Sequence, residues 1–133
     1  MKGKAAFVSD FDGTITGDDF FAYASEAFFD EKSLTPWRRF KKGEITHFEA
    51  LKEMFEKIRV SCGEFNAFMD KIPVDGGFAE GARICREKNM PVYICSAGCD
   101  YYINYLIGNI IEKYGVTLVA NRGSYSPETD LVM

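Results

Sequence analysis

The chain has 133 residues, a length that favours one domain or one domain with a small insertion. Its hydrophobic content of 47% and aromatic content of 15% suffice for a packed core, which excludes an intrinsically disordered chain. A net charge of −4 without a Lys/Arg block gives no electrostatic reason to expect nucleic acid as a partner. No stretch approaches the roughly 18 apolar residues of a membrane span, and the N-terminal apolar run is too short for a signal peptide.

The four cysteines include no CxxC pair and so give no indication of a metal site. Cys95 and Cys99 are four residues apart, with no histidine near enough to complete a zinc site. We therefore interpret all four as reduced thiols of the core or loops, and we expect a cytoplasmic protein.

The first predicted element is the apolar run 5–8, which leads into Asp10 and Asp12 and ends at a glycine turn. A run of about four to eight apolar residues that stops at such a turn is typical of a strand buried on both faces. Side chains two apart in a strand point to the same side, so both carboxylates should emerge together where the strand ends. Two adjacent acids there are costly unless a cation or a proton lies between them. The stretch therefore predicts a functional site.

The sequence pattern from about residue 18 to residue 72 predicts three or four short helices and no strand. Their start signals, in chain order, are Asp18-Asp19, Thr35-Pro36 and the capping boxes Thr46-His47-Phe48-Glu49 and Ser61-Cys62-Gly63-Glu64. Apolar and aromatic residues recur at helical spacing after these signals, so we interpret the aromatics mainly as core. His47 lies inside a capping box, where we expect it to be solvated.

Beyond this block, helices alternate with apolar strands. In chain order we predict a helix from Phe78 to Lys88, a strand from Val92 to Cys95 that ends at Ser96-Ala97-Gly98, a helix capped by Asp100 and ended by Gly115, and a strand from Val116 to Ala120. Residues 126–133 show no period that predicts an element.

This order of elements argues for an α/β fold with a Rossmann-like parallel sheet and right-handed crossovers. Residues 1–17 and 74–133 would form that core, of which three strands are visible. Residues 18–73 would form an all-helical cap inserted above the carboxyl edge of the sheet, where ligands bind in such folds.

Two runs resemble motifs of a known superfamily. Asp10-Phe11-Asp12-Gly13-Thr14 resembles the first motif of the haloacid dehalogenase-like hydrolases, and Ile94-Cys95-Ser96-Ala97-Gly98 resembles the second. The helical insertion is placed like the type-1 cap of that superfamily, and the layout is similar to its phosphoserine phosphatase-like branch. Within that branch, DGTIT, Pro36-Trp37 and Gly43-Glu44-Ile45 look closest to the methionine-salvage enol-phosphate phosphatases.

The resemblance implies a Mg²⁺-dependent phosphatase that hydrolyses a small phosphomonoester metabolite through an aspartyl-phosphate. Asp10 would be the nucleophile, and Asp12 would act first as the general acid and then as the base. The Asp10 carboxylate and the Asp12 backbone carbonyl would hold the Mg²⁺. The residues implied to bind phosphate or to shape the loop around it are Gly13, Thr14, Ser96, Ala97 and Gly98.

Two further motifs of the superfamily have no clear counterpart: a lysine after the second motif and an acidic pair on another strand. Lys113 would lie in the last turn of a helix and Lys88 precedes the second motif, while Glu128 and Asp130 follow no predicted strand. The chain is then either a truncated piece of a longer phosphatase or a degenerate, non-hydrolytic phosphate- or metal-binding domain. In either case the first strand would present an apolar edge that invites self-association or pairing with another chain.

Overall fold

The computed structural model of the protein describes residues 4–126 and 130–133. Its elements, in chain order, are β1 (Phe7–Ser9), α1 (Phe20–Phe28), α2 (Thr35–Lys41), α3 (His47–Phe55), α4 (Cys62–Asp70), α5 (Gly76–Glu87), β2 (Val92–Cys99), α6 (Asp100–Tyr114), β3 (Thr117–Asn121), β4 (Ser124–Ser126) and β5 (Asp130–Val132). The fold is α/β, with a parallel Rossmann-like sheet as predicted. None of the described helices is long and apolar enough to cross a bilayer.

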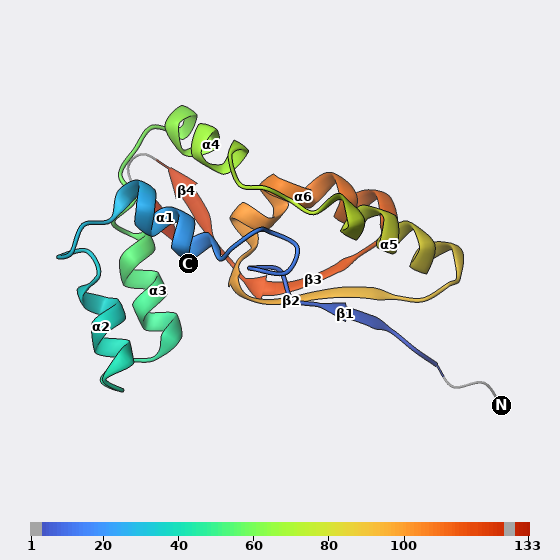
Figure 1. The fold of residues 1–133 in the computed structure, drawn as a ribbon, viewed down its shortest axis with the longest axis horizontal. Coiled ribbons are helices and arrows are strands. Elements are labelled where there is room, and N and C mark those ends of the chain that lie inside the picture. The colour runs from blue at the N-terminus through green and yellow to red at the C-terminus, as the bar shows by residue number, and fades with distance from the viewer. Residues whose placement is uncertain (1–3, 127–129) are drawn as a thin grey trace.

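The parallel sheet has the order β1-β2-β3, which leaves β1 at one edge. Figure 1 shows α5 and α6 on one side of these strands. Val92 and Ile94 on β2 are 4% and 0% exposed, whereas Val8 on β1 and Val119 on β3 are 61% and 54% exposed. The prediction that β1 is buried on both faces is therefore wrong, because no described helix covers the second face. The predicted apolar edge is present.

The four helices between β1 and α5 form an insertion at the carboxyl ends of the parallel strands (Figure 1). The chain enters and leaves this insertion through two adjacent segments. Thr16 forms an antiparallel bridge with Val74, and the Asp75 N–H donates to the Ile15 carbonyl at 2.8 Å. These contacts fall at the two ends of the segment 18–73.

Several predicted helix starts are present in the structure. Thr46 and Glu49 form the reciprocal capping box of α3, in which the Thr46 hydroxyl accepts the Glu49 N–H and the Glu49 carboxylate accepts the Thr46 N–H. The Ser61 hydroxyl accepts the Glu64 N–H at the start of α4. By contrast, the Thr35-Pro36 signal predicted Thr35 as the N-cap residue before α2, but Thr35 is the first residue of that helix.

Two predicted side-chain caps are wrong, because another carboxylate replaces that of Asp19 and because a backbone N–H from another segment occupies the carboxylate of Asp100. Asp19 precedes α1 but makes no capping bond, and the Phe20 N–H donates instead to the Asp12 carboxylate. Asp100 is the first residue of α6 and not its cap, and its carboxylate accepts the Gly123 N–H at 2.8 Å. The first of these exchanges ties the insertion to the end of β1.

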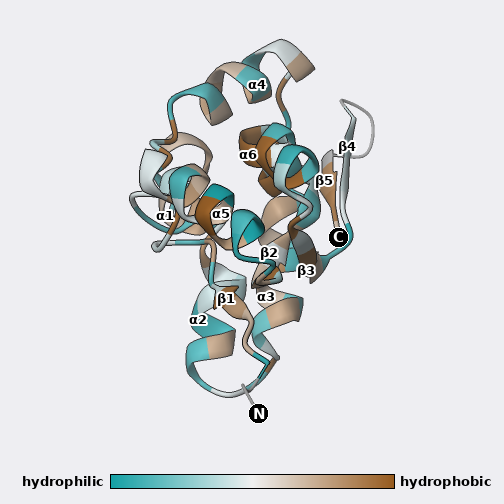
Figure 2. Ribbon diagram, turned by 90° about the vertical axis from the view of Figure 1, so that its right-hand side faces the viewer, coloured by the Kyte–Doolittle hydropathy of each residue, from teal (hydrophilic) through white to brown (hydrophobic). Residues whose placement is uncertain are grey.

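The C-terminal hairpin has no counterpart in the predictions. β4 pairs antiparallel with β5, and the Tyr125 ring stacks on Phe65 of α4 at a centroid distance of 4.3 Å. Leu131 on β5 is fully buried, and both β5 and α6 carry brown, hydrophobic segments in Figure 2. Strands of three residues are too short to show a period, which explains why the sequence pattern missed them. Glu128 lies outside the described residues.

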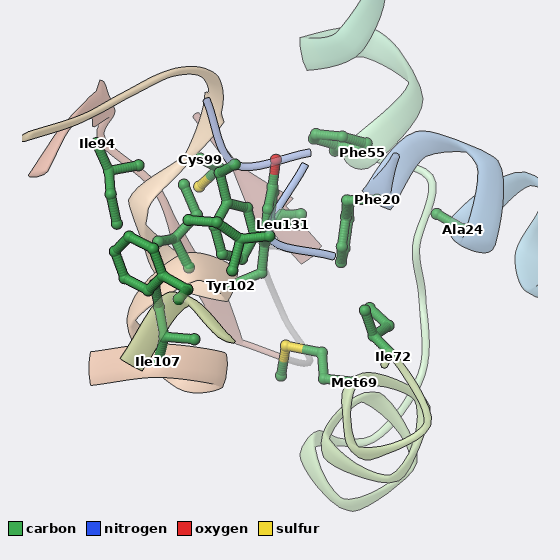
Figure 3. Packing of buried hydrophobic residues seen from close by; sticks show 14 of the residues in the cluster. Phe20, Ala24, Phe55, Met69, Ile72, Ile94, Cys99, Tyr102, Ile107 and Leu131 are labelled. Carbon is green, nitrogen blue, oxygen red and sulfur yellow. The ribbon is translucent and has the colours of Figure 1, made fainter. Parts of the chain in front are cut away.

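One hydrophobic core joins the insertion, the sheet and the hairpin. Figure 3 shows Phe20 of α1, Phe55 of α3, Met69 of α4, Tyr102 of α6 and Leu131 of β5 within a single cluster. All four cysteines are free thiols and lie in helices or strands, where Cys99 is buried and Cys62 and Cys95 are exposed.

Candidate active site

A cavity of about 220 Å³ opens at the carboxyl ends of β1 and β2. Its lining residues are Asp10, Asp12, Asp19, Phe21, Trp37, His47, Leu51, Phe55, Ser96, Ala97, Gly98 and Tyr102. The structure therefore brings together five of the predicted site residues from the two motifs, while Gly13 and Thr14 do not line this cavity. Parallel strands place their carboxyl ends at one edge, which is why residues more than 80 positions apart meet here.

Asp10 follows directly after β1 and is exposed to solvent. One of its carboxylate oxygens, Oδ1, accepts the Phe11 N–H at 2.7 Å, which fixes the orientation of the side chain at the cavity. Among the described residues, no hydrogen bond to Asp10 Oδ2 is found. A carboxylate held in this way is accessible to a ligand that enters the cavity.

Asp12 is half-buried, and both of its carboxylate oxygens accept hydrogen bonds. Oδ1 accepts the Phe20 N–H at 2.9 Å, and Oδ2 accepts the Tyr102 hydroxyl at 2.8 Å and the Ser96 hydroxyl at 3.3 Å. Burial raises the pKa of Asp12, and the bonds from Phe20 and Tyr102 oppose that rise. A carboxyl group whose pKa is raised holds its proton at a higher pH than an exposed aspartate does, which suits a general acid.

Ser96, Ala97 and Gly98 lie within β2, which extends to Cys99 and does not stop at Cys95 as predicted. The register with β3 shifts between Cys95 and Cys99, so these residues form an irregular segment of the strand. The Gly98 N–H donates to the Ser96 hydroxyl at 3.0 Å. The Ser96 hydroxyl donates to Asp12 Oδ2, which places this segment beside the loop that follows β1.

The absence of a side chain at Gly98 allows the cavity floor to close. A Cβ atom at this position would lie 2.8 Å from Asp12 Oδ2 and would overlap the Tyr102 hydroxyl. Gly98 is therefore needed for close approach and not for an unusual backbone conformation, since its φ lies outside the left-handed region.

Aromatic and aliphatic side chains from the insertion form the wall opposite the carboxylates. Phe21 stacks on Trp37 at a centroid distance of 4.6 Å, and His47 packs against Trp37 at 5.9 Å. The interpretation of His47 as solvated is wrong: it is half-buried and lines the cavity. His47 is the first residue of α3, and its ring packs against Trp37 and Phe40 of α2, at the cavity wall. The interpretation of the aromatics as core is confirmed for Phe20, whereas Trp37 is half-buried, packs against the core and also lines the cavity.

The cavity lining carries three carboxyl groups, on Asp10, Asp12 and Asp19, and no Lys or Arg. Lys113 and Lys88 are not among the lining residues either. In the described ranges no cluster of three His, Cys, Asp or Glu side chains is arranged to hold a metal. Mg²⁺ typically takes one or two protein carboxylates and fills its remaining positions with water and phosphate oxygens. The donor set therefore fits Mg²⁺ bound together with a phosphate, and not a closed structural metal site.

Tyr102 is the principal site residue that the sequence analysis missed. It lies in the first turn of α6, two residues after Asp100, so it starts from the same edge of the sheet as Ser96. Burial, followed by the charge of Asp12, raises the pKa of the Tyr102 hydroxyl, which remains a proton donor to that carboxylate. The feature of the sequence that could have drawn attention to Tyr102 is its position shortly after the second motif.

Comparison with known proteins finds no family model that matches the chain. A 2-hydroxy-3-keto-5-methylthiopentenyl-1-phosphate phosphatase of Bacillus cereus (strain B4264) is 26% identical over 121 residues, which are 90% of this chain and 54% of that protein. The protein of the same name from Lysinibacillus sphaericus is 28% identical over 130 residues, which are 94% of this chain and 55% of that protein. The chain thus spans about half the length of the curated relatives it matches.

Solved structures share the fold. A HAD-family hydrolase from Salmonella enterica serovar Typhi aligns with a TM-score of 0.71 at 14% identity, covering 97% of this chain and 44% of that protein. A substrate-bound phosphoserine phosphatase aligns with a TM-score of 0.68 at 18% identity, covering 99% of this chain and 62% of that protein. The resemblance to haloacid dehalogenase-like phosphatases that the two motifs predicted is confirmed: the chain has their fold.

Proposed function

We propose that the cavity hydrolyses a small phosphomonoester through an aspartyl-phosphate on Asp10. The observation that carries the proposal is the convergence of Asp10, Asp12 and Ser96 at one cavity, although the two motifs lie far apart in the chain. The relatives named as phosphatases support it independently of that geometry.

In this proposal the two aspartates have different roles because their environments differ. The exposed Asp10 carboxylate attacks phosphorus, forming a new oxygen–phosphorus bond as the ester bond to the leaving oxygen breaks. Asp12, whose pKa is raised by burial, gives its proton to that leaving oxygen. The Asp12 carboxylate then takes a proton from the water that attacks the aspartyl-phosphate, so phosphate leaves and both residues return to their starting state.

We propose that the Asp10 carboxylate and the Asp12 backbone carbonyl hold Mg²⁺. When bound, the ion neutralises charge between the anionic carboxylate and the anionic phosphoryl group. Ser96, Ala97 and Gly98 lie on the cavity surface beside Asp12 and would contact the phosphate oxygens. Gly13, with a φ of 73°, allows the sharp turn after Asp12, and Thr14 follows in the same turn.

We further propose that residues 1–17 and 74–133 act as the catalytic core and residues 18–73 as a cap that selects the substrate. The cap residues that line the cavity are Asp19, Phe21, Trp37, His47, Leu51 and Phe55. Apart from the Asp19 carboxylate they are aromatic or aliphatic, and none carries a permanent positive charge to pair with a substrate carboxylate, so the wall favours a compact, largely apolar organic group over an amino acid. A small metabolite as substrate and four free thiols support a cytoplasmic location.

The test is an assay of phosphate release by this chain from two esters, a short alkyl or enol phosphate with an apolar end and phosphoserine. We expect turnover that stops when EDTA removes Mg²⁺ and returns when Mg²⁺ is restored. We expect kcat/KM for the apolar ester to exceed that for phosphoserine by about tenfold or more. A folded chain that binds Mg²⁺ or phosphate without turnover would support the alternative, a non-hydrolytic binding domain.

We also propose that the apolar edge and open face of the sheet mediate self-association. Phe7 and Val8 on the edge strand are 45% and 61% exposed. We expect sedimentation velocity to show a dimer or larger species that Val8→Lys dissociates, because a lysine on an edge strand opposes further pairing. Phe48→Lys is the matched control, since Phe48 is a similarly exposed apolar residue on α3. A wild-type chain that stays monomeric at high concentration contradicts this proposal.

A further inference from the structure

We propose that Tyr102 is a positioning residue that holds the Asp12 carboxylate in the orientation needed to protonate the leaving group. This inference rests on the proposed function and assigns it a further residue. Tyr102 is 1% exposed, and its hydroxyl donates to Asp12 Oδ2 at 2.8 Å. The Ser96 hydroxyl approaches the same oxygen at the longer distance of 3.3 Å. Tyr102 therefore makes the shorter side-chain contact with the carboxylate.

The ring of Tyr102 is fixed by its neighbours. It stacks on Phe20 with a centroid distance of 4.0 Å and an interplanar angle of 1°, and it packs against Phe11 at 6.1 Å. A stacked and buried ring leaves its hydroxyl little freedom to move away from Asp12.

Phe20 completes the arrangement from the other side of the carboxylate. Its backbone N–H donates to Asp12 Oδ1 at 2.9 Å, while its ring supports Tyr102. Two residues in direct contact therefore hold one carboxylate oxygen each. Rotation of the Asp12 side chain would break at least one of these bonds, so α1 and α6 together set the direction in which Asp12 faces the cavity.

The bond from Tyr102 has a chemical consequence as well as a geometric one. A hydrogen bond donated to an ionised carboxylate is stronger than one donated to a neutral carboxyl group. The contact therefore strengthens as Asp12 gives its proton to the leaving oxygen, and it favours that step over substrate binding. Loss of the hydroxyl should lower kcat while leaving KM nearly unchanged.

The dependence on the leaving group separates this role from a structural one. Tyr102→Phe keeps the ring and removes only the hydroxyl. We expect the rate of Asp10 phosphorylation by an alkyl phosphate, whose leaving oxygen needs a proton, to fall about 10- to 100-fold when it is measured in the first turnover. For p-nitrophenyl phosphate, which leaves readily without protonation, we expect this rate to fall by less than about threefold. Hydrolysis of the aspartyl-phosphate, in which Asp12 is the base for either ester, does not enter this rate. Equal losses on the two esters, or no loss on either, would overturn the proposal.

Tyr105→Phe is the matched control. Tyr105 lies on the same helix, and its hydroxyl donates to Asp70 at 2.7 Å, away from the cavity. We expect both esters to be hydrolysed at the wild-type rate by this variant.

A second measurement does not depend on turnover. Tyr102→Phe should lower the urea midpoint of the otherwise wild-type chain, and this loss should disappear in an Asp12→Ala background, where the hydroxyl has no acceptor. If the wild-type chain is active but Tyr102→Phe has the same effect on the urea midpoint in both backgrounds, the positioning role of Tyr102 is wrong and the proposed function is unaffected. If the wild-type chain is inactive but keeps the coupling, the proposed function is wrong, and the contact between Tyr102 and Asp12 only stabilises the fold.

Discussion

Replacement of Asp10 by Asn should abolish turnover, with kcat falling by about four orders of magnitude or more. The Asn amide has nearly the shape of the carboxylate but carries no negative charge to attack phosphorus. Its Oδ1 still accepts the Phe11 N–H that orients the native side chain, so we expect the fold to be retained. Phosphate release under saturating substrate and Mg²⁺ measures the effect, and circular dichroism verifies the fold.

Asp18→Asn is the matched control for this change. Asp18 is also exposed and follows the same motif, but it does not line the cavity, and its side chain accepts only the neighbouring Asp19 N–H among the hydrogen bonds found in the described residues. We expect its kcat to stay within about twofold of wild type. If Asp10→Asn kept more than about a tenth of the wild-type rate, or if both variants lost activity equally, Asp10 would not be the nucleophile.

Gly98→Ala should both destabilise the protein and disable the site. The added methyl group would lie 2.8 Å from Asp12 Oδ2 and would overlap the Tyr102 hydroxyl. The end of a flexible side chain could move aside, but Tyr102 is buried and stacked on Phe20. We expect a loss of about 1–3 kcal/mol in the free energy of unfolding, as for other overpacked sites. Displacement of Asp12 should lower kcat about 100-fold.

Gly81→Ala provides the contrast. Gly81 lies inside α5, and a Cβ there would meet no atom within 4 Å. Alanine is the better helix former, so we expect this variant to gain about 0.5–1 kcal/mol in the free energy of unfolding. Urea unfolding of both variants measures the difference. A Gly98→Ala variant as stable and as active as Gly81→Ala would contradict the packing around Tyr102.

Much of the site could be predicted because its parts depend on short-range patterns. The apolar run before Asp10 and the one before Ser96 each predict a strand, and parallel strands bring their carboxyl ends to one edge. The capping box at Thr46 depends on residues three apart, and the structure reproduces it. The meeting of Asp12 and Ser96 follows from these local signals and one rule of topology.

The remaining features depend on contacts between distant segments. The position of Tyr102 after the second motif places it near the site, but it does not indicate that the hydroxyl meets Asp12, since that contact requires the irregular strand at Gly98 and the placement of Phe20. His47 faces the cavity because α3 packs on α2, which its capping box does not reveal. Burial of β1 on both faces was predicted from the apolar run alone, although burial depends on which other segments are present to cover it.

The environment of a single carboxyl group, that of Asp12, also could not be predicted from the sequence. The sequence places it next to Asp10 and predicts a pair, but it does not separate their environments. The structure does so: Asp10 is exposed, whereas Asp12 is half-buried and accepts bonds from α1 and α6. The resemblance to the superfamily implied Asp10 as nucleophile and Asp12 as acid, and this difference in environment supports that proposal.

The most direct test of the account is to trap the covalent intermediate. The chain is mixed with Mg²⁺ and a phosphomonoester that it turns over, quenched in acid within the first turnovers, digested and mapped by mass spectrometry. We expect one phosphoryl group on the peptide that contains Asp10, labile to hydroxylamine as an acyl phosphate is, and absent from Asp10→Asn. Turnover without any such adduct, or with the phosphoryl group on another residue, would contradict it.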